Sequence, residues 1–218
     1  MRSATFVLAA VFGCAASPLT AQSVSGTGSA FTVVRRTGYE GAAYEQAGVM
    51  YGGAGEAGLG PVTISVSTLI GKLTGDDGDV HPPVDVRSTS AALRVRVVPW
   101  LALGAQLEAR RVASDVGGTS VWRLIGPQLL VTPPLGVVGF HAVGELSYYP
   151  SAVVTNGPKM KTALRTMIGA GFARRGGGPT ARVGYRFERY DFSDSGGSSP
   201  RLEQFGGIVA EVGFRLGR

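Results

Sequence analysis

Apolar and polar residues alternate along residues 180–191, and this alternation is the clearest pattern in the chain. Successive side chains of an extended strand point to opposite sides, so the two sets of residues fall on two faces. One face carries Ala181, Val183, Tyr185 and Phe187, and the other carries Arg182, Gly184, Arg186 and Glu188. The final segment, residues 207–216, has the same arrangement. Both segments are predicted to be strands with one apolar face and one face of charged or very small residues.

Comparable segments recur along the rest of the chain. The pattern predicts strands at residues 30–36, 46–59, 62–73, 89–98, 101–112, 120–131, 137–149, 160–174, 180–191 and 207–216. The first of these has the weakest alternation. The phase of residues 120–131 stays open, because Leu124, Ile125, Leu129 and Leu130 occupy both faces.

The connections between these segments carry a second signal. From residue 59 onward, short turns such as 58–61, 99–100, 132–135 and 176–179 alternate with longer polar stretches at 74–88, 113–119, 150–158 and 193–200. Transmembrane β-barrels combine this asymmetry with strands that are apolar towards lipid and polar towards the interior. We therefore predict an all-β, antiparallel, up-and-down transmembrane β-barrel of about ten strands, with eight as the alternative count.

Aromatic residues gather near the predicted strand ends. Trp100, Phe172 and Phe214 lie near one set of ends, and Trp122, Tyr148, Tyr149, Tyr190 and Phe192 lie near the other. Two interfacial girdles would have this distribution. Arg111, Arg123 and Arg189 are predicted to face lipid near the outer ends, where long side chains can reach the interface.

On these patterns the chain resembles the small outer-membrane β-barrel proteins of Gram-negative bacteria. The resemblance covers nearly all of residues 23–218 and implies a location in the outer membrane. It also implies outer-membrane lipids, lipopolysaccharide and the barrel-assembly machinery as partners. The chain departs from the family at its end, which reads Phe214-Arg215-Leu216-Gly217-Arg218 where such proteins commonly have a terminal aromatic residue.

Composition agrees with strands in lipid. The 34 glycines suit narrow barrel interiors and tight turns, and the charged fraction of 17% is low. The net charge of +6 invites a nucleic-acid interpretation. We disfavour it, because the basic residues are dispersed along strand faces that also carry Glu108, Glu188 and Glu211.

Residues 1–22 have the features of a secretory signal peptide: Arg2, a short apolar run at 4–16 and the small-residue exit Leu19-Thr20-Ala21. Residues 23–218 then form the barrel domain. Cys14 is the only cysteine, so the exported chain is expected to hold no disulfide. Lipidation at Cys14, which ends the lipobox-like Val11-Phe12-Gly13-Cys14, is the alternative.

The charged residues predicted to face the lumen are the candidate site. They are Arg94, Arg96, Glu108, Arg110, His141, Glu145, Arg165, Arg182, Arg186, Glu188, Glu211 and Arg215, together with Gln106 and Lys161. A small barrel fills its interior with side chains, and buried charges need partners, so we expect a structural polar plug. The alternative is a narrow pore that favours anions.

Two further groups were considered as chemical sites. His141 and Glu145 share a strand face but lie about 13 Å apart along it, too far for an acid/base pair. Asp76, Asp77, Asp79, His81 and Asp85 crowd one connection, which we interpret as a solvated loop and not as a metal site.

The sequence thus predicts a protein that is not an enzyme and has no cofactor, acting as a structural or surface-interaction protein with an unknown external partner. A soluble periplasmic β-barrel that binds a small ligand is the remaining alternative.

Overall fold

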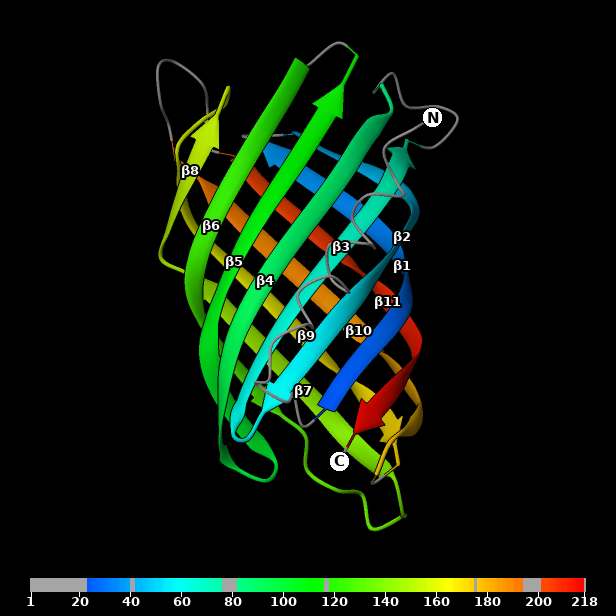
Figure 1. Ribbon diagram of the computed structural model, residues 1–218. Coiled ribbons are helices and arrows are strands. Elements are labelled where there is room, and N and C mark those ends of the chain that lie inside the picture. Colours follow the sequence, from blue (N-terminus) through cyan, green and yellow to red (C-terminus); the bar gives the residue numbers. More distant parts are fainter. Residues whose placement is uncertain are drawn as a thin grey trace, which may run out of the picture.

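The computed structural model describes residues 23–39, 42–75, 82–115, 118–174, 176–193 and 201–217, and these form a tilted antiparallel barrel (Figure 1). The strands are β1 (Ser23–Tyr39), β2 (Ala42–Leu59), β3 (Val62–Thr74), β4 (Val84–Val98), β5 (Leu101–Ser114), β6 (Gly118–Val131), β7 (Phe140–Tyr149), β8 (Ser151–Thr155), β9 (Met160–Ala173), β10 (Gly178–Phe192) and β11 (Arg201–Gly217). Within the described part of the chain, no helix is long and apolar enough to cross a membrane.

The sheet closes because β1 pairs with β11 as well as with β2. Pairing runs from each strand to the next in sequence except at β7 and β8, which both pair with β6, and β7 pairs in turn with β9. Pro150 separates β7 from β8 and has no N–H to donate to the ladder, so these two segments form one interrupted strand. The result is a closed barrel of ten strands, which confirms the predicted fold class and the predicted count over the alternative of eight.

Several predicted boundaries are wrong. β1 begins at Ser23 and includes the small polar residues that were left outside the first strand. The outer connections at residues 40–41 and 115–117 are short, whereas the inner connection at residues 132–139 is long. The alternation of short and long connections predicted from residue 59 onward therefore fails at residues 115–117 and 132–139, whereas the connection at 40–41 is short as expected. We call the end that holds Ser23 and Gly217 the inner end, and the opposite end the outer end.

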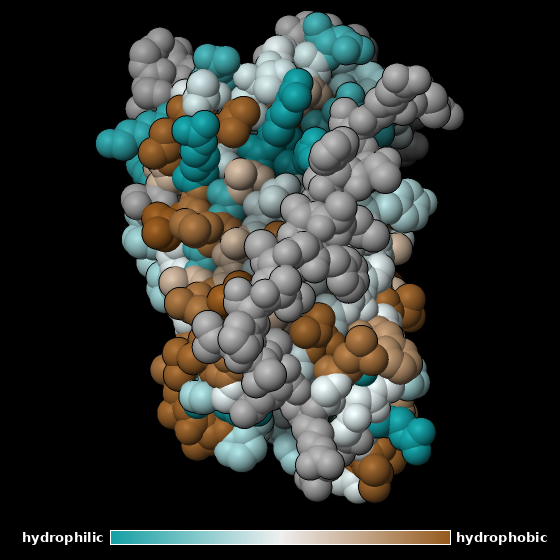
Figure 2. All heavy atoms as spheres, in the orientation of Figure 1, coloured by the Kyte–Doolittle hydropathy of each residue, from teal (hydrophilic) through white to brown (hydrophobic). Residues whose placement is uncertain are grey.

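An apolar belt covers the outside of the barrel towards its inner end, and Figure 2 shows part of it as the hydrophobic residues in the lower half of the face in view. Its outward-facing side chains are exposed and include Ile64, Val66, Leu93, Val95, Leu103, Leu107, Ile168, Val183, Tyr185, Ile208, Val212 and Phe214. A transmembrane strand needs only about 9 to 11 residues, yet most of these strands have 13 to 18. The barrel is therefore taller than a bilayer, and the excess length lies at the outer end.

The polarity of the wall is reversed in this outer part, which we call the collar. Many of its outward-facing residues are charged: Arg36, Glu45, Lys72, Asp85, Arg87, Arg111, Arg123, Arg189 and Asp191. Val34, Ile70 and Val153 are exposed among them. Most of its inward-facing residues form a buried apolar cluster: Phe31, Val33, Met50, Leu69, Leu73, Val84, Val86, Val112, Trp122, Leu124, Tyr149, Met160, Ala163, Met167, Tyr190, Phe192, Phe205 and Val209. The collar is thus built like a water-soluble barrel. Figure 2 shows hydrophilic residues gathered in the upper part of the face in view.

The outer aromatic girdle predicted from the sequence is wrong for four residues. Trp122, Tyr149, Tyr190 and Phe192 are buried inside the collar and not at a lipid interface. Trp122 packs against Tyr190 and Phe192, with ring centroids 5.0 and 5.3 Å away. The inner girdle agrees better with the prediction, because Trp100 and Phe214 are exposed and Phe172 packs against Phe140. Likewise, the outward arginines that were expected to snorkel from lipid lie on the polar wall of the collar.

Glycine allows the strands to approach closely where the wall bends. A Cβ atom at Gly126 would overlap the backbone oxygen of Tyr148, and one at Gly207 would overlap that of Thr32. Any side chain at these lumen-facing positions would push neighbouring strands apart. Part of the high glycine content is therefore required by the curvature of the sheet.

Candidate functional site in the lumen

Five charged side chains meet across the lumen just below the collar, and we call them the central network. Glu108 and Arg110 come from β5, Arg165 from β9, and Arg186 and Glu188 from β10. Alternation on each strand turns them inward, and the side chains of Glu108 and Glu188 have no exposed surface. Strands on opposite sides of the barrel therefore contact each other through these groups.

Each carboxylate of the central network is held by several cations. Arg165 forms ion pairs with Glu108 and with Glu188, the latter at 3.0 Å from Nε to Oε1. Arg110 also pairs with both carboxylates, at 3.1 Å from Glu108, and Arg186 donates to Glu188 from Nε at 2.7 Å. Buried charges are tolerated only when they are paired in this way.

Hydroxyl groups complete the coordination of the two carboxylates. Ser88 donates to Glu108 at 2.7 Å, and the Tyr149 hydroxyl donates to the same carboxylate at 3.3 Å. The Tyr190 hydroxyl donates to Glu188 at 3.0 Å. Both tyrosines belong to the apolar cluster, so they join the base of the collar to the charged layer beneath it.

The guanidinium groups contact aromatic faces on their collar side. Arg110 lies between the rings of Tyr190 and Phe205, 4.9 and 4.8 Å from their centroids, and Arg186 lies 5.3 Å from the centroid of Phe31. A cation over an aromatic face is attracted by the ring quadrupole. Through these contacts the central network packs directly against the apolar cluster of the collar.

A second polar layer lies on the inner side of the central network. Gln128 donates to Gln106 at 3.2 Å and to Glu145 at 3.0 Å, and Ser147 donates to Gln106 at 2.7 Å. Arg182 donates to Glu211 at 2.6 Å. Arg94 pairs with Glu56 at 2.6 Å, a carboxylate that was absent from the predicted set.

Sequence reasoning also missed a cluster inside the collar. The Arg35 guanidinium donates to Glu203 at 3.0 and 3.1 Å and to Gln46 at 2.6 Å, and Arg201 pairs with Glu203 at 2.8 Å. Arg35 and Glu203 lie 168 positions apart, and only the closure of β1 onto β11 brings them together. The available signal was an inward alternation that places Arg35 and Thr37 on the face of Phe31.

The remaining predicted residues lie apart from the central network. Arg96 is exposed at the inner end, and Arg215 is half-buried there. His141 lies over Gly171 on the neighbouring strand, and no hydrogen bond or ion pair joins it to Glu145. Lys161 is exposed on the outside of β9, so its predicted lumen position is wrong.

No group of His, Cys, Asp or Glu residues in the described part of the chain is arranged to hold a metal ion. Of the acidic connection, Asp76, Asp77, Asp79 and His81 lie outside the described residues. Asp85 is an exposed collar residue at the start of β4. Residues 1–22, with the predicted signal peptide and Cys14, also lie outside the described part.

Comparison with known proteins supports the architecture. No protein-family model and no curated protein sequence matches the chain. Among solved structures, the outer membrane protease OmpT from Escherichia coli has a TM-score of 0.59 at 10% identity, covering 90% of this chain and 97% of OmpT. The translocator domain of the autotransporter NalP from Neisseria meningitidis has a TM-score of 0.47 at 11% identity, covering 89% and 88%. The Pseudomonas putida toluene transporter TodX has a TM-score of 0.37 at 9% identity, covering 95% and 93%.

The likeness to OmpT shows a shared fold, and the predicted outer-membrane β-barrel architecture is confirmed. The predicted outer-membrane location agrees with this fold and with the apolar belt. One prediction needs correction. We inferred that the protein is not an enzyme, because His141 and Glu145 are too far apart to act as an acid/base pair. That inference is wrong, because a barrel of the same architecture is an outer membrane protease. The fold gives no ground for excluding catalysis.

Proposed function

We propose that the barrel is sealed to ions and solutes and holds a rigid external platform above the outer membrane. The observation that carries this proposal is the stacking of two filled layers in the lumen. The central network meets across the barrel with its carboxylates fully buried, and the apolar cluster fills the collar above it. An ion crossing this path would have to separate the buried ion pairs of the central network and then pass the packed collar interior, which is largely apolar and holds its own buried Arg35–Glu203 pair. Both steps are costly.

The collar supports the second part of the proposal. Its wall carries many charged residues on the outside and is packed within, so it can stand in water without collapse. The connections from β3 to β4 and from β10 to β11 leave its rim. A surface-interaction role follows, in which the belt anchors the protein and the collar presents these connections to a partner outside the cell.

Conductance in a planar bilayer tests the seal. The folded protein should show no stepwise conductance, whereas a general porin in the same bilayer serves as the positive control. Discrete anion-selective steps from the wild-type protein would refute the sealed lumen and support the narrow pore.

Cysteine labelling tests the platform. Because Cys14 is the only cysteine, single substitutions give a clean signal. A membrane-impermeant maleimide added to intact cells should label Arg36→Cys in the collar and leave Val183→Cys in the belt unlabelled. Labelling of Arg36→Cys only after the outer membrane is permeabilised would show that the collar faces the periplasm. Strong labelling of both variants in a soluble fraction would support the periplasmic alternative.

A further inference from the structure

Three arginines lie side by side on the outside of the barrel at the base of the collar. Arg87 on β4 is directly opposite Arg111 on β5. Arg123 on β6 is opposite Ala109, two residues further from the rim along β5 than Arg111. All three are exposed. Among the described residues, no carboxylate forms an ion pair with any of them.

Other outward arginines of the collar are neutralised by the protein itself. Arg36 pairs with Glu45 at 2.6 Å, and Arg189 pairs with Asp191 at 3.0 Å. By contrast, Arg87 and Arg111 place like charges directly across an antiparallel pair, an arrangement that destabilises a sheet. An external anion bound by both side chains would remove this repulsion.

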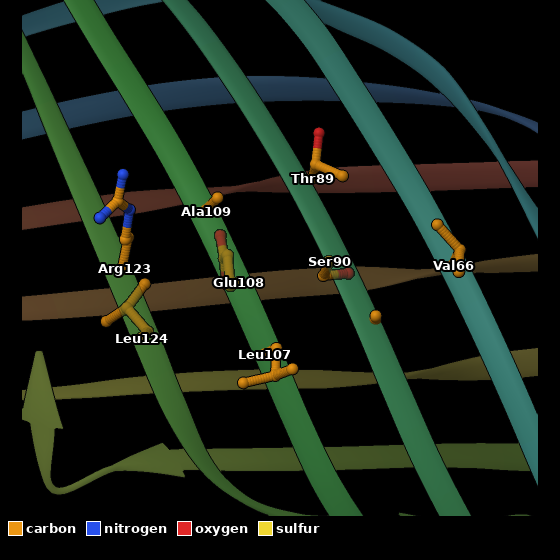
Figure 3. A pocket seen from close by; sticks show the side chains of 9 residues that line it. Val66, Thr89, Ser90, Leu107, Glu108, Ala109, Arg123 and Leu124 are labelled. Carbon is orange, nitrogen blue, oxygen red and sulfur yellow. The ribbon is translucent and has the colours of Figure 1, made fainter. Parts of the chain in front are cut away.

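An apolar groove begins at the same place and extends into the belt (Figure 3). Its volume is about 310 Å³, and its outward lining includes Val66, Ala91, Leu107, Ala109 and the side chain of Arg123. Figure 3 shows Leu107, Ala109 and Arg123 on the adjacent strands β5 and β6. The groove exists because alanines interrupt a wall of larger side chains. Apart from Thr89 and Arg123, its outward lining is apolar, which suits a hydrocarbon chain.

From the outer end towards the inner end, the order of these features matches the order of headgroup and acyl chains in a lipid. Arginines lie at the base of the collar, the groove runs below them, and Leu93 and Val95 of the belt follow further along β4. Guanidinium groups bind phosphate oxygens with two parallel hydrogen bonds, so they favour this anion. The three side chains span three strands, or about 10 Å at 4.8 Å per strand. That width suits a headgroup with more than one phosphate better than a single phosphodiester.

We propose that Arg87, Arg111 and Arg123 bind the phosphates of lipopolysaccharide, with one of its acyl chains in the groove beside Ala91 and Ala109. The ligand belongs to the outer leaflet at the level where the barrel wall changes from apolar to charged. This site is independent of the lumen, so its failure would leave the sealed-platform proposal untouched.

The test is lipopolysaccharide retention by the folded protein in detergent, measured by native mass spectrometry and by titration with added lipopolysaccharide. The triple variant Arg87→Gln, Arg111→Gln, Arg123→Gln should bind at least about tenfold more weakly, because it loses several charge-assisted hydrogen bonds. The matched control is the double variant Arg36→Gln, Arg189→Gln, which removes paired arginines from the same collar and should bind like the wild type. Gel mobility without boiling verifies that each variant is folded.

The groove is tested separately on one face of one strand. Ala109→Leu fills the groove, whereas Ala105→Leu adds the same atoms to β5 outside its lining. Only Ala109→Leu should weaken the binding of lipopolysaccharide. Dephosphorylated lipopolysaccharide and phosphatidylglycerol distinguish the ligand, and both should bind more weakly than intact lipopolysaccharide. Equal binding by the triple variant and the wild type would overturn the proposal, as would equal losses in the triple and double variants. Equal binding of phosphatidylglycerol would overturn the assignment to lipopolysaccharide.

Discussion

A single arginine placed on the outward face of β4 should cost very different amounts at two heights. Val95 lies in the belt, where its side chain is 46% exposed to the surroundings of the barrel. Thr89 lies on the same face, six residues nearer the outer end, and its hydroxyl is 3.4 Å from that of Thr68. At about 3.3 Å per residue and a tilt of about 40°, the two positions differ by about 15 Å in height.

The apolar band of such barrels is about 25 Å tall, so its midplane lies about 12 Å below its upper edge. If Thr89 lies at the upper edge, Val95 lies close to the midplane. Val95→Arg should therefore destabilise the folded barrel by about 2 to 4 kcal/mol, and Thr89→Arg by about 0 to 1 kcal/mol. The two variants add the same charge to the same face of the same strand. Their difference isolates the depth in the bilayer from the chemistry of the substitution.

The assay is reversible folding into phospholipid vesicles over a urea titration, with the shift in gel mobility on boiling as the readout for the closed barrel. A large cost at Val95 with a small cost at Thr89 would place the belt and the collar where the structure has them. Equal costs at the two positions would refute the change of surroundings along β4. A larger cost at Thr89 would show that the outer end is the part embedded in lipid.

Three further outcomes are expected in the same titration. Glu188→Gln should cost about 3 to 5 kcal/mol, because the buried Glu188 carboxylate pairs with three arginines. Glu211→Gln, which affects one close pair, should cost less, and equal costs would contradict the assigned network. Gly207→Ala should destabilise the barrel, because its Cβ would overlap a carbonyl oxygen of β1, whereas Gly28→Ala meets open space and should be nearly neutral. Trp122→Ala should cost about 3 to 5 kcal/mol by emptying the centre of the apolar cluster, and a negligible cost would show that the collar is not a packed core.

The sequence predicts those parts of the fold in which one pattern holds along the whole strand. In β3 and β11, apolar outward residues alternate with small or polar inward ones over most of the length, and these strands were found with nearly correct faces. The count of ten strands followed from the same regularity. Alternation identifies a strand, but it does not say on which side of the strand the apolar solvent lies.

The collar was missed because its strands change pattern in the middle. In β6, Trp122 and Leu124 face the packed interior of the collar, whereas the next residue, Ile125, faces outward in the belt. Apolar side chains therefore stand on both faces, and no single phase fits residues 120–131. Because of the same reversal, Tyr190 is not an interfacial residue as predicted but faces the lumen, where its hydroxyl donates a hydrogen bond to Glu188.

The partners inside the lumen were also beyond reach of the sequence. Alternation places Arg35, Glu108 and Glu188 on inward faces, but the pairing depends on the register of strands that are far apart in the chain. Arg35 contacts Glu203 across the closing pair of strands, and Arg165 contacts Glu108 across the lumen. Neither contact has a local signature, so the residue types were predictable and the network was not.

The height at which the wall changes pattern explains why charges accumulate there on both of its sides. Arg110 and Arg111 are consecutive on β5, and they point to opposite faces. Arg110 is buried in the lumen against Glu108 and Glu188, whereas Arg111 is exposed outside and forms no ion pair with any carboxylate of the described residues. Inside, the charged layer separates the polar lumen from the apolar cluster. Outside, the same level separates the belt from water. Removal of Arg110 should therefore reduce stability, whereas removal of Arg111 should reduce lipid binding, although the two residues are adjacent on one strand.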